Sequence, residues 1–200
     1  MKGIFRIVCL LGLTTSLLLS SKAALSTESA HYVGLTYVSG IRDVWDWHED
    51  TVDPDEFEHG APVALSYRFA AIEDEGLRLD LGLGPIVLIM GDIEYSDIPF
   101  QFSLGYSFFN SSSIRPYARV GASIHFNSGD YLVDENTVGG VGAIGIDFGE
   151  AGSTNFFIEA AYDSAEATFS GIRIDDNFEP IQTEDTILLN GFTLTLGARF

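Results

Sequence analysis

The sequence predicts an all-β fold: an eight-stranded antiparallel β-barrel of the transmembrane, outer-membrane type. Three observations predict it. They are an export signal at the N-terminus, strand-like alternation over most of the chain, and small or polar residues on the strand faces opposite the apolar ones. Together they favour a wall that is apolar outside and polar inside.

Residues 1–23 have the three parts of a secretory signal: basic residues, the apolar run IVCLLGLTTSLLL, and small residues up to Ala23. That run of 13 residues is too short for a membrane-spanning helix, which needs about 20. Cleavage is expected after Ala23, which leaves residues 24–200 as one outer-membrane barrel domain. The only cysteine, Cys9, leaves with the signal, so no disulfide is expected.

Charge excludes one class of partner. The signal removes three of the ten basic residues and none of the 29 acids, which leaves a net charge of −22. Binding to phosphate backbones needs a basic surface, so no nucleic-acid partner is expected.

Eight runs of the chain have strand character and are separated by turn signals. The segments VALSYRF and FQFSLGYSF alternate most clearly between apolar and small or polar residues. No run shows a sustained helical period, so no helix is expected. The eight expected strands span residues 32–39, 61–70, 77–90, 98–109, 114–127, 138–148, 155–169 and 186–200.

The faces opposite the apolar ones decide between a soluble and a membrane barrel. In a soluble sandwich or lipocalin the apolar face points inward, whereas in an outer-membrane barrel it points to lipid. The opposite face of the fourth run carries Gln101, Ser103, Gly105 and Ser107, which is small for a solvated surface. Glycine weakens a strand unless something crowds it, and a narrow barrel interior does so. We therefore expect these residues inside the barrel.

The connections fall into two classes. Links after the even-numbered strands are short and rich in turn residues, whereas three of the four links after the odd-numbered strands are long. Bacterial outer-membrane barrels have short periplasmic turns and longer outer loops. The expected outer loops span residues 40–60, 91–97, 128–137 and 170–185.

The last strand, GFTLTLGARF, alternates up to a terminal phenylalanine, and RPYARVGASIHF contains a PY-x-x-x-G pattern. With the signal and the eight strands, these segments resemble the OmpA/OmpX-like and opacity-type surface proteins. The resemblance implies a monomer in the outer membrane of a Gram-negative bacterium, in contact with membrane lipid and lipopolysaccharide. It also implies recognition of the last strand by the barrel-assembly machinery. It implies no cofactor and no catalytic activity.

The first outer loop is unusually acidic. Such a loop suits divalent cations or a binding partner, because hard cations take several carboxylate oxygens. The spacing fits no EF-hand, and a solvated acidic loop is favoured over a metal site. Trp45 and Trp47 near its start are interpreted as part of an interfacial aromatic girdle. The acids are Asp43, Asp46, Glu49, Asp50, Asp53, Asp55, Glu56 and Glu58.

An enzymatic alternative rests on His125 and Ser128 in HFNS, which superficially resemble the histidine and serine of lipid A deacylase barrels. Residues three apart on a strand point to opposite faces, so the pair does not suit a nucleophile and its base. The prediction is that the protein is not an enzyme, with a lipid-modifying enzyme kept as the alternative.

Inward-facing charges form the best-supported constellation. Unpaired charges are costly away from water, so these residues are expected to pair across the lumen. Counting residues along the strands predicts an ion pair between Arg119 and Glu159, with Asp147 as competing partner. A structural plug is favoured, and a narrow ion channel is the alternative, because eight strands leave room only for side chains. The expected lumen charges are Arg68, Arg78, Asp80, Arg119, Asp147, Glu159, Asp163 and Arg199.

Overall fold

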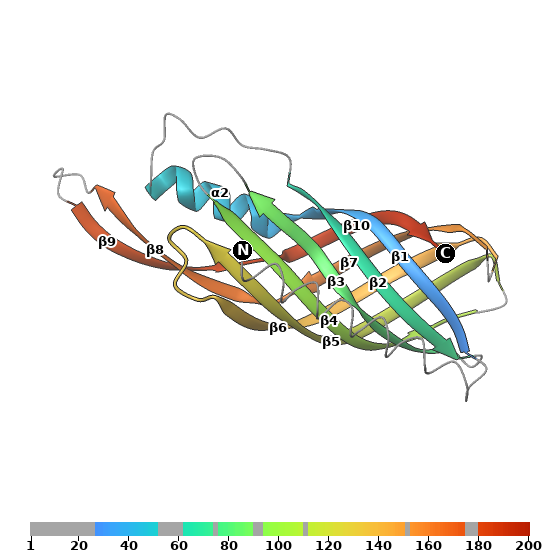
Figure 1. The fold of residues 1–200 in the computed structure, drawn as a ribbon. Helices are drawn as coiled ribbons and strands as arrows, with labels where there is room; N and C mark the ends of the chain where they lie inside the picture. Colours follow the sequence, from blue (N-terminus) through green and yellow to red (C-terminus); the bar gives the residue numbers. More distant parts are fainter. Residues whose placement is uncertain are drawn as a thin grey trace, which may run out of the picture.

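Eight strands close into an antiparallel barrel in the computed structural model (Figure 1). It describes residues 27–51, 62–73, 76–89, 94–109, 112–150, 153–174 and 180–200. The expected signal, residues 1–23, lies outside these ranges, as does most of the second half of the expected acidic loop.

Strands that follow one another in the chain are neighbours in the wall from β1 to β7, and β10 then closes the wall between β7 and β1. Going around it from β1 and back, the order is β1, β10, β7, β6, β5, β4, β3, β2, and every neighbouring pair is antiparallel. The wall strands are β1 (Thr27–Val38), β2 (Val63–Glu73), β3 (Leu77–Ile89), β4 (Tyr95–Ser107), β5 (Ile114–Gly129), β6 (Asn136–Phe148), β7 (Asn155–Asp163) and β10 (Gly191–Arg199).

Alternation sorts the side chains as expected. On β1, Leu35 is 60% exposed on the outer face, while Tyr32 and Thr36 are buried inside. Glycine fits where the interior is crowded: a Cβ on Gly145 of β6 would overlap the Tyr117 ring. The outer wall is therefore apolar and the interior is filled by polar and aromatic side chains.

Two of the eight expected strands are each broken in two. The run expected over 155–169 ends in the wall at Asp163 and continues as β8 (Glu166–Ile174), and the run over 186–200 begins as β9 (Pro180–Leu188). β8 and β9 pair with each other and form a hairpin beyond the barrel, and a single bridge joins Phe169 of β8 to Leu132 (Figure 1). The break on the β9 side lies at Gly191, whose φ of 56° suits glycine. The expected loop over 170–185 is thus largely a hairpin.

The other correction is a helix. Residues 40–60 are expected as a loop, but the segment begins as α2 (Ser39–Thr51), a helix of 13 residues. Ile41, Val44, Trp45 and His48 are all buried and recur at helical spacing, so one face of α2 is held against the barrel. No helix among the described residues is long and apolar enough to cross a membrane.

The two ends of the barrel differ. The end that carries α2, the β8–β9 hairpin and the segment between β5 and β6 is called the cap end here. The other end, called the turn end, carries the short links between β2 and β3, β4 and β5, and β6 and β7 (Figure 1). At the turn end the start of β1 meets the end of β10, where the amide of His31 donates to the carbonyl oxygen of Phe200 over 3.0 Å.

Candidate functional site

All eight of the charged residues expected in the lumen are buried there. Each stands on an inward position of its strand, so strand parity alone carries these side chains into the interior. They do not form one cluster. They divide into a central group, a group at the turn end and a group below the cap.

Glu159 of β7 is the centre of the first group. Its carboxylate accepts two bonds from Arg119 of β5, 2.8 Å from Nη2 to Oε1 and 3.1 Å from Nε to Oε2. Arg68 of β2 donates to the same carboxylate from across the lumen, and the Tyr117 hydroxyl donates over 2.9 Å. The Arg119–Glu159 pair expected from strand positions is therefore present, with Arg68 as a second partner that sequence reasoning did not find.

Arg68 links this group to a second carboxylate. Its Nε lies 3.2 Å from Oδ1 of Asp80 on the neighbouring β3. Arg78 holds Asp80 in a two-pronged contact, with Nε 2.9 Å from Oδ2 and Nη2 2.8 Å from Oδ1. The guanidinium of Arg78 stands 4.0 Å from the centre of the Tyr117 ring, and that of Arg68 stands 4.4 Å from the Tyr32 ring. Stacking on aromatic rings adds to the stabilisation of both cations.

Asp147 does not compete for Arg119, and that expectation is wrong. Asp147 pairs in register with Arg115 and Phe157, whereas Glu159 pairs with Gly145, so Asp147 lies nearer the turn end. There it accepts from the Tyr32 hydroxyl over 2.8 Å and lies 3.5 Å from Nε of Arg199.

The turn end holds two charged residues that sequence reasoning missed, Glu28 and Arg115. Arg199 also binds the carboxylate of Glu28, and Arg115 lies 4.0 Å from the same carboxylate. Arg115 stands on the same face of β5 as Arg119, so strand parity was a signal that could have found it.

The third group lies below the cap. His125 is fully buried on β5 and stands between two carboxylates, with Nδ1 2.9 Å from Asp97 and Nε2 3.2 Å from Asp163. Ser123 donates to Asp163 over 2.8 Å. Asp97 was missed because the expected strand began one residue after it. Ser128 is exposed on the opposite face of β5, so the pair weighed as an enzymatic signal is separated by the wall.

Little space is left among these side chains. The cavity beside Glu159, between Arg68, Arg119 and Pro85, has a volume of about 30 Å³. It holds no more than about two water molecules. The described part of the lumen is thus filled by ion pairs and rings from the turn end up to His125.

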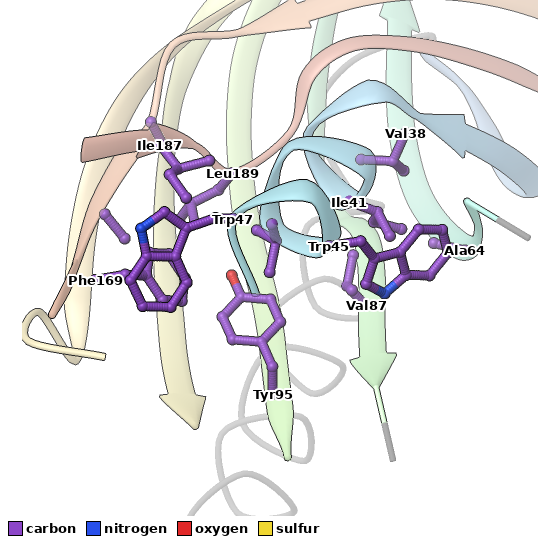
Figure 2. Close-up of a cluster of buried hydrophobic side chains, with 13 residues drawn as sticks. Val38, Ile41, Trp45, Trp47, Ala64, Val87, Tyr95, Phe169, Ile187 and Leu189 are labelled. Atoms are coloured by element: carbon purple, nitrogen blue, oxygen red, sulfur yellow. The ribbon is translucent and has the colours of Figure 1, made fainter. Parts of the chain in front are cut away.

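An apolar plug closes the cap end above the ion pairs. Figure 2 shows Trp45 and Val87 on one side of α2, and Trp47, Phe169 and Tyr95 on the other. Both tryptophans are only 7% exposed, so their interpretation as an interfacial girdle is wrong. They face the mouth of the barrel because they stand on the apolar face of a helix, not on a strand.

His48 lies inside this plug. Its Nδ1 is 2.7 Å from the carbonyl oxygen of Val44, and its ring stands edge-on to Trp47 and Phe169. Burial lowers the pKa of His48, although the bond to the carbonyl opposes this shift. The neutral ring is therefore the form that suits the plug.

The acids expected in the first loop divide between α2 and the chain beyond it. Asp43 and Asp46 are exposed on α2, Glu49 is half-buried there, and Asp50 belongs to the same helix. Asp53, Asp55, Glu56 and Glu58 lie outside the described residues. Within the described ranges, no group of three or more histidines, cysteines and acids is placed to hold a metal ion.

Comparisons with known proteins agree with this geometry at the level of fold. OprG from Pseudomonas aeruginosa is 12% identical, with a TM-score of 0.56 over 88% of this chain and 95% of OprG. AlkL, solved in DMPC lipid bilayers, is 16% identical, with a TM-score of 0.52 over 90% of this chain and 92% of AlkL. The chain has the fold of the small outer-membrane β-barrels. The N-terminal barrel of OprF from Pseudomonas aeruginosa is more distant, with 8% identity and a TM-score of 0.45.

No family model matches the chain, and no curated protein matches it either.

Proposed function

We propose that this protein spans the outer membrane of a Gram-negative bacterium as a closed barrel and acts as a structural or surface-interaction protein. The outer wall supports membrane insertion: Val120, Ile144 and Phe156 are 68%, 67% and 74% exposed, on three neighbouring strands. A continuous apolar wall of this kind suits lipid and would promote aggregation in water.

The filled lumen is the observation that favours a structural role over a pore. Glu159 holds Arg68 and Arg119 from two other strands, and α2 covers the mouth above them. A nutrient pore needs a continuous water path, and this interior leaves room for side chains only. The barrel therefore serves as a rigid support for what stands at its cap end.

The cap end supports a role at the cell surface. It carries α2, the hairpin and the longer connections, whereas the turn end carries the short turns that face the periplasm in bacterial barrels. We place the cap end outside, in contact with lipopolysaccharide. Divalent cations bridge its exposed carboxylates to lipid phosphates in this arrangement.

Three further parts of the proposal follow the resemblance to OmpA/OmpX-like and opacity-type proteins. The chain inserts with the help of the barrel-assembly machinery, which reads the last strand, and it functions as a monomer. It has no enzymatic activity, since the wall separates His125 from Ser128 and the imidazole is already held by two carboxylates.

Fractionation and conductance test the proposal together. The protein is expected to sediment with outer membranes, to show a heat-dependent gel shift, and to give no steady current in planar bilayers. A soluble periplasmic protein would remove the membrane assignment. Steady conductance by the parent protein would replace the closed barrel with the narrow channel.

A further inference from the structure

An open groove lies at the cap end, where four parts of the chain meet. It has a volume of about 730 Å³ and lies between the end of α2, the β5–β6 connection and the two strands of the hairpin. This volume falls in the range of small-molecule sites, about 300–1,000 Å³. Its lining includes Thr51, Tyr131, Ser170, Ile172, Pro180 and Gln182.

Tyr131 is held in an unfavourable backbone conformation at this groove. Its φ is 64°, a left-handed value that costs a bulky residue free energy and that glycine or asparagine would adopt more easily. Its carbonyl oxygen accepts a 2.8 Å bond from the amide of Ser170, which fixes the turn against β8. The side chain is nevertheless 43% exposed, so burial does not explain why a tyrosine stands there.

The aromatic surface continues below Tyr131. The Tyr131 ring lies 6.2 Å from the ring of Trp47 and 6.0 Å from that of His48. Gly171 leaves Trp47 close beneath the backbone of β8, since a Cβ at this glycine would stand 3.2 Å from Cη2 of Trp47. A ligand in the groove would therefore change the surroundings of a tryptophan.

The described residues that line the groove are neutral, although the protein is strongly acidic. The groove has hydroxyl groups from Thr51 and Ser170, an amide from Gln182, and apolar surface from Ile172 and Pro180. The chain as a whole has a net charge of −19, which disfavours anions. Among the described residues, no carboxylate lines the groove to attract a cation, and a wholly apolar ligand would leave the amide and hydroxyls without partners.

We propose that this groove binds a neutral carbohydrate. A sugar ring has an apolar face of C–H groups that packs on an aromatic ring, and hydroxyl edges that pair with amides and hydroxyls. Tyr131 provides the ring, and the amide of Gln182, 3.3 Å from the Ser170 hydroxyl, provides donors and an acceptor beside it. This inference rests on the proposed surface role and names the ligand class for it.

The test uses the full mature chain refolded in detergent. Its probes are an array of neutral oligosaccharides, including maltotriose, with sulfated forms of the same sugars, and the neutral outer saccharide released from the host's own lipopolysaccharide. Binding is followed by tryptophan emission, because both tryptophans of the chain, Trp45 and Trp47, stand on α2. Saturable binding of at least one neutral sugar is expected, weakened at least about tenfold by sulfation.

Tyr131→Gly is the decisive variant. Glycine adopts the observed φ without strain, so the turn is preserved while the aromatic ring is lost, and affinity is expected to fall at least about tenfold. Gln182→Ala should weaken binding as well. Val133→Ala, an exposed position in the same connection, should bind like the parent.

Three outcomes would overturn the inference: no saturable binding across the array, tighter binding of sulfated sugars, or unchanged affinity in Tyr131→Gly. The arms with foreign oligosaccharides and with the released saccharide separate a host glycan from the cell's own surface sugar. Because binding is measured on refolded protein, a negative result would contradict only the carbohydrate site. The outer-membrane assignment is tested separately by fractionation.

Discussion

At the scale of single residues, the lumen depends on carboxylates that are shared between cations. Glu159 is bound by Arg68 and Arg119 from two different strands, and Asp80 is bound by Arg68 and Arg78. A shared carboxylate has no replacement when it is lost, because the next acid is already engaged. The central group is therefore expected to be sensitive to one substitution.

Glu159→Ala should lower the free energy of unfolding by about 3–5 kcal/mol, because it leaves Arg119 and part of Arg68 buried without a counter-charge. Denaturant unfolding in detergent measures this. Glu159→Gln keeps an acceptor oxygen and should cost less. Glu166→Ala removes an exposed acid on β8 and is the matched control. Equal stability of Glu159→Ala and the control would show that the pair does not hold the wall.

His48 makes the plug sensitive to pH. Burial lowers its pKa, so the unfolded chain takes up a proton at a higher pH than the folded one. The stabilisation is fully present above the ordinary pKa of about 6.5 and is lost as the pH falls below it. Tryptophan emission should shift to longer wavelength on acidification.

His48→Phe fills the same site with a ring that does not titrate and should abolish this shift. Asp130 is the nearby carboxylate that favours the protonated ring, and its effect is smaller than that of burial. An identical acid transition in His48→Phe would assign the shift to another group.

At the scale of elements, the inward and outward faces of the strands could be predicted from the sequence, whereas the helix α2 could not. Every inward charge that the alternation predicted lies in the lumen, because period two fixes the face of a strand residue whatever its neighbours are. The spacing of Ile41, Val44, Trp45 and His48 is also periodic, at 3.6 residues per turn. It was hidden because the segment is short and rich in acids and lies where outer loops are expected.

Pairing partners were only partly predictable. The Arg119–Glu159 pair follows from counting residues up β5 and β7, which one strand separates. The contact of Arg68 with Glu159 depends on the closure of the sheet, which leaves only β1 and β10 between β2 and β7. The hairpin was missed for a related reason, since β8 continues β7 without a break in alternation and only pairing shows where the wall ends.

Val44→Asp should release α2 without opening the wall. Val44 is 1% exposed in the apolar plug, and an unpaired carboxylate there is costly. Emission of both tryptophans should shift to longer wavelength and α2 should become sensitive to protease, while the heat-dependent gel shift stays.

Arg42→Asp places a carboxylate on the exposed side of α2, where it also removes the exposed ion pair with Asp46, and is the control. Loss of the gel shift in Val44→Asp would mean that the plug and the wall fold as one unit.

At the scale of the whole molecule, the main feature is a polarity along the barrel axis: the two ends of the lumen are filled by different kinds of side chain. Ion pairs fill the lumen from the turn end to His125, and the apolar plug follows at the cap end. Such an order gives each end a separate role, with charge pairing holding the wall and apolar contacts holding the cap.

This polarity predicts the accessibility of inserted tags in intact cells. A tag at residue 53, which follows α2 in the chain, should be labelled from outside, and a tag at Ser112 between β4 and β5 should not. Labelling after permeabilisation shows that both tags are present. The reverse order of labelling would show that the barrel has the opposite orientation in the membrane.

The meeting of the first and last wall strands, β1 and β10, at the turn end has a consequence for the order of the strands. His31 and Phe200 exchange two backbone hydrogen bonds, 3.0 and 2.9 Å long, so a short linker would join the end of β10 to the start of β1, and new termini could be opened elsewhere. A circular permutant cut after Phe108 would end in PFQFSLGYSF, which again alternates up to a terminal phenylalanine. It should refold in detergent like the parent and insert in cells as well. Refolding without insertion in cells would mean that the assembly machinery reads the strand GFTLTLGARF itself and not the alternating pattern that both strands share.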